Sequence, residues 1–125
     1  VVAKKIDVKL MGVSVLTSFD SKDLFNLGFK DKMNEQVLRL IKIADEANLH
    51  GVICSPLEIK MIKDYSPKLK CFTPGIRMKN DKSDQKRTMN ANEAIKAGSD
   101  CLIIGRPITE GDPKKNIQNI ISSIN

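Results

Sequence analysis

Residues 73–109 read TPGIRMKNDKSDQKRTMNANEAIKAGSDCLIIGRPIT, and this stretch decides the fold. Two short apolar runs, 70–73 and 101–104, each lead into a turn that contains a glycine and an arginine. A polar loop and one helical segment separate them. A strand, a crossover helix and a second strand form the repeating unit of parallel α/β proteins, whose ligands bind where the strands end. The stretch therefore predicts an anion site at the carboxyl ends of two parallel strands, with the rest of the chain as its scaffold.

The strand-then-helix order continues through the other residues. Short apolar runs predict strands at 10–16, 51–54, 70–73 and 101–104. Capping residues and apolar spacings of three and four predict helices from Asp20 or Ser21 to Leu27, from Asn34 to about Asn48, from Pro56 to Tyr65, from Asn90 to Gly98 and from Pro113 onward. Ser55 with Glu58, and Asn90 with Glu93, are the pairs that predict capping boxes at two of these starts. The chain thus contains four β/α units.

Four such units predict a parallel sheet with right-handed crossovers. Residues 1–125 fit a single domain, but a closed eight-stranded (β/α)8 TIM barrel takes roughly 250 residues. The chain therefore has the length of a half-barrel. An open four-stranded doubly wound sheet is the alternative, and fold logic alone leaves both open.

Composition excludes several classes of function. Hydrophobic residues make up 41% of the chain, which is enough for a core, and the net charge of +6 favours an anionic ligand. The lysines are scattered without interleaved aromatic side chains, so a nucleic-acid surface is not expected. No run of 18 apolar residues is present, so no membrane span is expected.

The three cysteines, Cys54, Cys71 and Cys101, stand singly in or beside apolar runs. Their odd count and wide spacing argue against a disulfide framework and against a metal site, and they predict reduced thiols in a cytoplasmic protein. The chain begins at Val1 rather than at a methionine, as expected of a processed chain or of a fragment of a longer one.

The candidate anion site is formed by the turns at Gly75-Ile76-Arg77 and Gly105-Arg106. Glycine lets the backbone approach an anion closely, and a guanidinium group can bind two phosphate oxygens at once. The alternative is that both glycines only form turns and both arginines are solvated. The polar loop between Arg77 and Arg87 is either a lid over the ligand or a plain surface loop.

Five segments together resemble the bacterial orotidine 5'-phosphate decarboxylases. They are LTS at 16–18, VICS at 52–55 with Glu58, TPGIR at 73–77, DQKR at 84–87 and GRPIT at 105–109. The resemblance extends from about Leu10 to the end of the chain. The interval from Arg77 to Gln85 is about one residue shorter than is usual in that family.

The resemblance implies roles for five residues. Thr17 would hydrogen-bond the pyrimidine edge, and Gln85 would bridge the phosphate and the base. Arg106 would bind the 5'-phosphate beside the backbone of Gly105, with Arg77 as a further substrate-binding arginine. It also implies a cofactor-free carbon–carbon lyase that converts orotidine 5'-phosphate (OMP) to uridine 5'-monophosphate (UMP) and carbon dioxide in pyrimidine biosynthesis, built as a TIM barrel and paired as a homodimer.

The family's catalytic lysine and aspartates come from a D-x-K-x-x-D segment, and the chain contains no such segment. The four units would then be the fifth to eighth of the barrel, the C-terminal half, which binds substrate but is inactive alone. Two alternatives stay open: a non-catalytic nucleotide-phosphate-binding half-barrel, and another phosphate-sugar barrel enzyme of the superfamily. An isolated half-barrel is expected to be oligomeric or poorly soluble, with a second copy or an N-terminal half-barrel as its partner.

Overall fold

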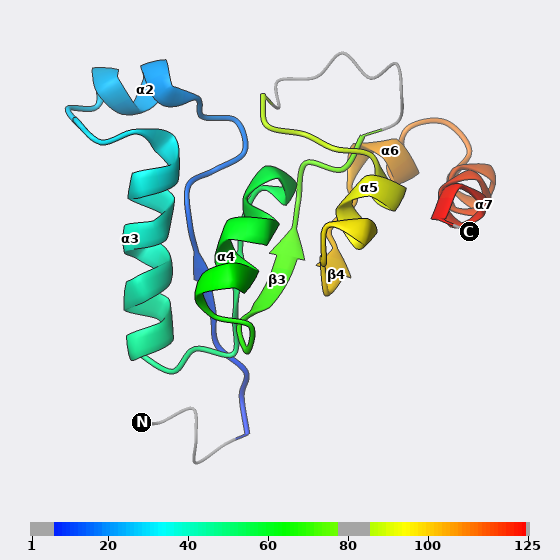
Figure 1. Ribbon diagram of the computed structural model, residues 1–125. Coiled ribbons are helices and arrows are strands. Elements are labelled where there is room, and N and C mark those ends of the chain that lie inside the picture. The colour runs from blue at the N-terminus through cyan, green and yellow to red at the C-terminus, as the bar shows by residue number, and fades with distance from the viewer. Residues whose placement is uncertain (1–6, 78–85, 125) are drawn as a thin grey trace.

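The sheet consists of four parallel strands in the order β1-β2-β3-β4 (Figure 1). The structure, a computed structural model, describes residues 7–77 and 86–124. Its strands are β1 (Met11–Val13), β2 (Gly51–Ile53), β3 (Lys70–Thr73) and β4 (Cys101–Leu102). Each strand pairs with the next one in sequence, as in the wall of a barrel, whereas a doubly wound sheet reverses its strand order at a switch point. The order therefore favours the half-barrel over the open doubly wound sheet.

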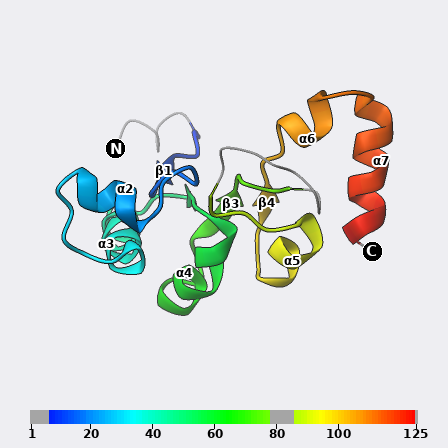
Figure 2. The same ribbon diagram turned by 90° about the horizontal axis from the view of Figure 1, so that it is seen from above.

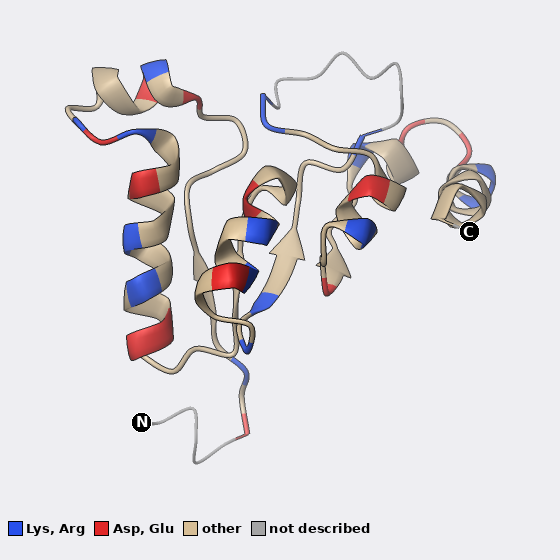
Figure 3. Ribbon diagram, viewed as in Figure 1, with Lys and Arg blue, Asp and Glu red and all other residues tan. Residues whose placement is uncertain are grey.

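Helices connect the strands. They are α2 (Ser21–Asn26), α3 (Met33–Glu46), the 3-10 turn η1 (Pro56–Glu58), α4 (Ile59–Tyr65), α5 (Ala91–Lys96), α6 (Arg106–Thr109) and α7 (Pro113–Ile124). Seen from above, α3, α4 and α5 lie on the same side of the sheet (Figure 2). Both basic and acidic residues occur along α3 and α4, in keeping with the scattered charge of the sequence (Figure 3). Within the described part of the chain, no helix is long and apolar enough to span a membrane.

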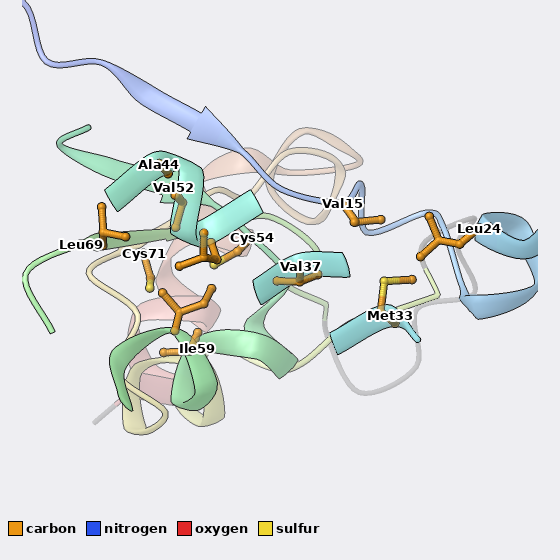
Figure 4. Close-up of a cluster of buried hydrophobic side chains, with 12 residues drawn as sticks. Val15, Leu24, Met33, Val37, Ala44, Val52, Cys54, Ile59, Leu69 and Cys71 are labelled. Atoms are coloured by element: carbon orange, nitrogen blue, oxygen red, sulfur yellow. The ribbon is translucent and has the colours of Figure 1, made fainter. Parts of the chain in front are cut away.

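The main core lies between the sheet and the helices α3 and α4 (Figure 4). In the strand register Gly12 lies beside Val52, and Val52 beside Cys71, so these residues share one face of the sheet. Val52 and Cys71 are buried there against Val37 and Ile41 of α3. The spacing of apolar residues predicted this face of α3 correctly.

The opposite face of the sheet is apolar but partly exposed. Val13 pairs with Ile53, one residue out of phase with the buried row, and its exposed fraction is 54%. Ile103, which follows β4, is 40% exposed. In a closed barrel this face is the interior, which side chains from all strands fill.

Several predicted element boundaries are wrong. Strand β1 ends at Val13 rather than at residue 16, because the chain turns away after the hydrogen bond from Ser14 N to Ile53 O. Strand β4 ends at Leu102, although Ile103 N still donates to Thr73 O. Helix α3 begins at Met33 rather than Asn34, because Glu35 accepts the N–H of Lys32 and caps the helix earlier. The capping boxes predicted at Ser55 and at Asn90 are confirmed.

The carboxylate of Asp100 joins three elements at the amino-terminal end of the sheet. It accepts hydrogen bonds from the backbone N–H of Cys71 at 2.9 Å, from Lys63 at 2.6 Å and from Lys70 at 3.0 Å. Burial alone would raise the pKa of Asp100, but these three donors outweigh it and lower the pKa from 3.8 to about 2. The ionised form is therefore favoured by the folded state.

Replacing Asp100 with asparagine is expected to lower the free energy of unfolding at pH 7 by about 1 kcal/mol, a value kept small because solvent screens this partly exposed group. Since the pKa is lowered on folding, the stabilisation is present above pH 4 and is lost as the pH falls from about 4 through 2. Urea unfolding at pH 7 and at pH 2 measures the difference. Asp64→Asn, at an exposed pair with Lys60, serves as the control. An equal loss for Asp100→Asn at both pH values would contradict the prediction.

Candidate substrate-binding site

A pocket of about 390 Å³ lies at the carboxyl ends of the four strands. Each segment that follows a strand contributes to its lining: Thr17 after β1, Cys54 after β2, Arg77 after β3 and Arg106 after β4. Val13 and Ile103 of the partly exposed sheet face form its apolar floor. The pocket therefore combines an apolar surface with two guanidinium groups, which suits a ligand with a flat ring and an anionic group.

The structure brings together four of the five predicted site residues. Thr17, Arg77, Gly105 and Arg106 all line this pocket. Gln85 lies outside the described residues, so its placement stays a prediction. The turns after β3 and β4, together with the loop after β1, thus converge on one site.

Gly105 and Arg106 begin the short helix α6, directly after β4. The carbonyl of Gly105 accepts hydrogen bonds from Ile108 N at 2.8 Å and Thr109 N at 3.2 Å, which fix the turn. A methyl group added at Gly105 would meet no atom within 4 Å. The backbone at Gly105 therefore borders open space, and a ligand can approach it closely beside the Arg106 side chain.

Gly75 and Arg77 form the turn after β3. Gly75 has a φ of +79°, which glycine adopts readily and other residues rarely do. Arg77 N donates to Met89 O at 3.1 Å, and Met89 N donates to Gly75 O at 3.3 Å. The segment after the polar loop is thereby held along the turn that carries Arg77.

Arg87, the last residue of the DQKR motif, has buried contacts that the sequence did not predict. Its exposed fraction is only 8%, and its guanidinium donates to the carbonyl oxygens of Val15, Leu16 and Phe19. It also forms an ion pair with Glu58, which is 3% exposed. Burial lowers the pKa of the Arg87 guanidinium below its ordinary value.

Lys86 anchors the same segment on the outside of the molecule. Its ammonium group contacts Asp20, the N-cap residue of α2, at 2.9 Å and Asp23, in the first turn of α2, at 2.8 Å. The hydrogen bond from Lys86 is the main reason that the pKa of Asp20 falls to about 2. Lys86 and Arg87 therefore hold the segment in place, and neither lines the pocket.

The contacts of Ser55, Cys54 and Cys71 are those of structural residues. Ser55 accepts the N–H of Leu57 at 3.2 Å and donates to Arg87 O at 3.2 Å, so the predicted capping role is confirmed. Cys54 and Cys71 are buried, and the hydrogen bond between them together with burial raises the pKa of Cys54. A protonated, buried thiol behaves as a small apolar side chain.

Comparison with known proteins gives a consistent result. The sequence profile described as "Orotidine 5'-phosphate decarboxylase / HUMPS family" matches residues 1–120. The orotidine 5'-phosphate decarboxylase of Ehrlichia canis (strain Jake) is 45% identical over 120 residues, which are 94% of this chain and 53% of that protein. The corresponding protein of Lawsonia intracellularis is 46% identical over 117 residues, 92% of this chain and 50% of that protein.

Solved structures agree. Orotidine 5'-phosphate decarboxylase from Lactobacillus acidophilus matches with a TM-score of 0.74 and 36% identity, over 94% of this chain and 49% of that chain. The Sulfolobus solfataricus protein, at 17% identity, has a TM-score of 0.69 and supports the fold alone. The fold prediction, four β/α units of a TIM barrel, is thereby confirmed.

The chain spans about half the length of the curated relatives it matches. The five motifs indicated a resemblance to this family, and the profile match and identities near 45% confirm it. By its sequence and by its fold, the chain belongs to the orotidine 5'-phosphate decarboxylase / HUMPS family.

Proposed function

We propose that this chain provides the substrate-binding, C-terminal half of an orotidine 5'-phosphate decarboxylase. The reaction is the cofactor-free conversion of OMP to UMP and carbon dioxide, in the cytoplasm, as a step of pyrimidine biosynthesis. The observation that carries the proposal is the single pocket that Thr17, Arg77, Gly105 and Arg106 share at the carboxyl ends of the strands. The match to a decarboxylase, which is 45% identical to this chain over 53% of its own length, supports the proposal.

Within this pocket the residues have separate tasks. Arg106 and the backbone of Gly105 bind the 5'-phosphate, and Thr17 hydrogen-bonds the pyrimidine edge. Arg77 adds positive charge from the turn after β3, and Gln85 bridges the phosphate and the base. Binding energy from the phosphate, remote from the reacting carboxylate, then serves to hold the ring where decarboxylation takes place.

The lysine and aspartates that transfer the proton come from outside this chain. No D-x-K-x-x-D segment occurs in its 125 residues. The same fact favours a second candidate, a half-barrel that binds nucleotide phosphates without catalysing a reaction. In the decarboxylase proposal an N-terminal half-barrel covers the apolar sheet face that Val13 and Ile103 leave exposed, whereas in the binding module a second copy of this chain covers it.

Mixing the chain with the N-terminal half of a relative, such as the Ehrlichia canis protein, tests the proposal. Alone, the chain is expected to bind UMP, to release no carbon dioxide from OMP and to sediment as an oligomer. With the N-terminal half, a complex that releases carbon dioxide from OMP is expected. A well-folded complex that binds UMP but stays inactive would favour the binding module instead.

A further inference from the structure

The loop after β1, residues 15–19, is bound by two consecutive residues, Lys86 and Arg87, which lie between β3 and α5. Arg87 Nη2 donates to Val15 O at 2.8 Å and to Leu16 O at 2.9 Å, and Arg87 Nε donates to Phe19 O at 2.9 Å. The backbone N–H groups of Lys86 and Arg87 both donate to Thr17 O, at 3.1 and 3.2 Å. Lys86 and Arg87 thus bind four carbonyl oxygens of a five-residue loop.

The segment after β2 holds Arg87 from the other side. Its Nη1 pairs with Glu58, and the second oxygen of Glu58 accepts Ser55 N at 3.2 Å. Ser55 Oγ donates to Arg87 O at 3.2 Å. A charged group that is this deeply buried requires an opposite charge, which Glu58 provides, and hydrogen-bond acceptors, which the carbonyl oxygens of the loop after β1 provide to Nε and Nη2.

Arg87 does not line the pocket, but the loop that it binds does. Leu16 and Thr17 are lining residues. A methyl group added at Gly75 would lie 3.1 Å from Arg87 O and 3.4 Å from Thr17 Cγ2, so these three residues pack without spare room. The depth of Thr17 in the pocket is therefore set by the position of Arg87.

We propose that Arg87, fixed by Glu58, is a positioning residue that places Thr17 against the pyrimidine base and so determines affinity for the base rather than for the phosphate. The inference rests on the proposed function. Arginine suits this task because its planar guanidinium has five N–H donors that point in different directions. Here they reach three carbonyl oxygens on one side and a carboxylate on the other, whereas the single ammonium of lysine has only three donors at one atom.

Titrations of the chain with UMP and with ribose 5-phosphate test the proposal, because only UMP carries a base. Arg87→Lys is expected to weaken UMP binding about tenfold, the value of one hydrogen bond, and to change ribose 5-phosphate binding by less than about twofold. Thr17→Ala should weaken UMP binding by a similar factor, because it removes the side chain that is proposed to contact the base. The loop itself should stay in place, since Thr17 contacts Lys86 and Arg87 through its carbonyl, which alanine retains. The double variant should bind UMP no more weakly than Thr17→Ala alone, because the two residues act as one unit.

Arg39→Lys, at a surface ion pair with Asp31, is the matched control and should leave both affinities unchanged. If circular dichroism shows that Arg87→Lys does not fold, Glu58→Gln replaces it, with the same selective loss expected at about threefold. Equal loss of both ligands, additive effects in the double variant, or failure of both Arg87→Lys and Glu58→Gln to fold would each overturn the inference. If the wild-type chain binds neither ligand, the proposed function falls, and the inference with it.

Discussion

Arg106→Ala is expected to weaken the binding of UMP by about 100-fold or more. It removes the charge-assisted hydrogen bonds that we propose between Arg106 and the 5'-phosphate, and such bonds contribute about 1.5–3 kcal/mol each. Arg106 lies in the first turn of α6, beside a glycine whose backbone borders open space, and it lines the pocket with Thr17 and Arg77. The side chain is exposed, so its removal should not change the fold. Isothermal titration with UMP measures the loss.

Two further variants make this test specific. Arg106→Lys should fall between the wild type and Arg106→Ala, because lysine keeps the charge but not the two-pronged geometry that binds two phosphate oxygens. Arg39→Ala removes a surface arginine that pairs with Asp31, and it should bind UMP as the wild type does. If Arg106→Ala bound UMP normally, Arg106 would not be the phosphate-binding residue.

Most of the scaffold could be predicted from the sequence because its signals are local. The run 70–73 has the apolar residues Cys71 and Phe72 at its centre, and the structure has a strand with these same bounds. The capping pairs Ser55 with Glu58 and Asn90 with Glu93 lie three residues apart, and η1 and α5 begin directly after Ser55 and Asn90. The placement of Arg77 and Arg106 in one pocket could be predicted because parallel strands bring their following turns to one edge.

The role of Arg87 could not be predicted because its partners are distant in sequence. Its guanidinium binds the carbonyl oxygens of Val15 and Leu16, which lie 72 and 71 residues earlier in the chain. Any residue has a carbonyl, so such partners leave no pattern of residue types. The only sequence signal was a second basic residue at the end of the DQKR motif, and the structure shows that Lys86 and Arg87 point to different partners.

Gly51→Ala is expected to lower the free energy of unfolding by about 3 kcal/mol, the upper part of the range for overpacking a core. Gly51 begins the central strand β2, between Met11 of β1 and Lys70 of β3. A methyl group there would lie 2.3 Å from Lys70 O and 2.8 Å from Lys70 Cβ. The first of these atoms is backbone and cannot move without displacing the β2–β3 register.

Gly105→Ala is the matched control, because a methyl group at Gly105 meets no atom within 4 Å. Its stability should stay within about 0.5 kcal/mol of the wild type, while a ligand that needs close approach to this backbone should bind more weakly. Gly51→Ala therefore tests the stability of the fold, and Gly105→Ala tests ligand binding. Gly51 lies at the end of the sheet opposite the pocket, and Gly51→Ala should reduce UMP binding only in proportion to the unfolded fraction seen in urea titrations. Equal stabilities of the two variants would show that the β2–β3 register has room for a side chain at Gly51, contrary to the packing described above.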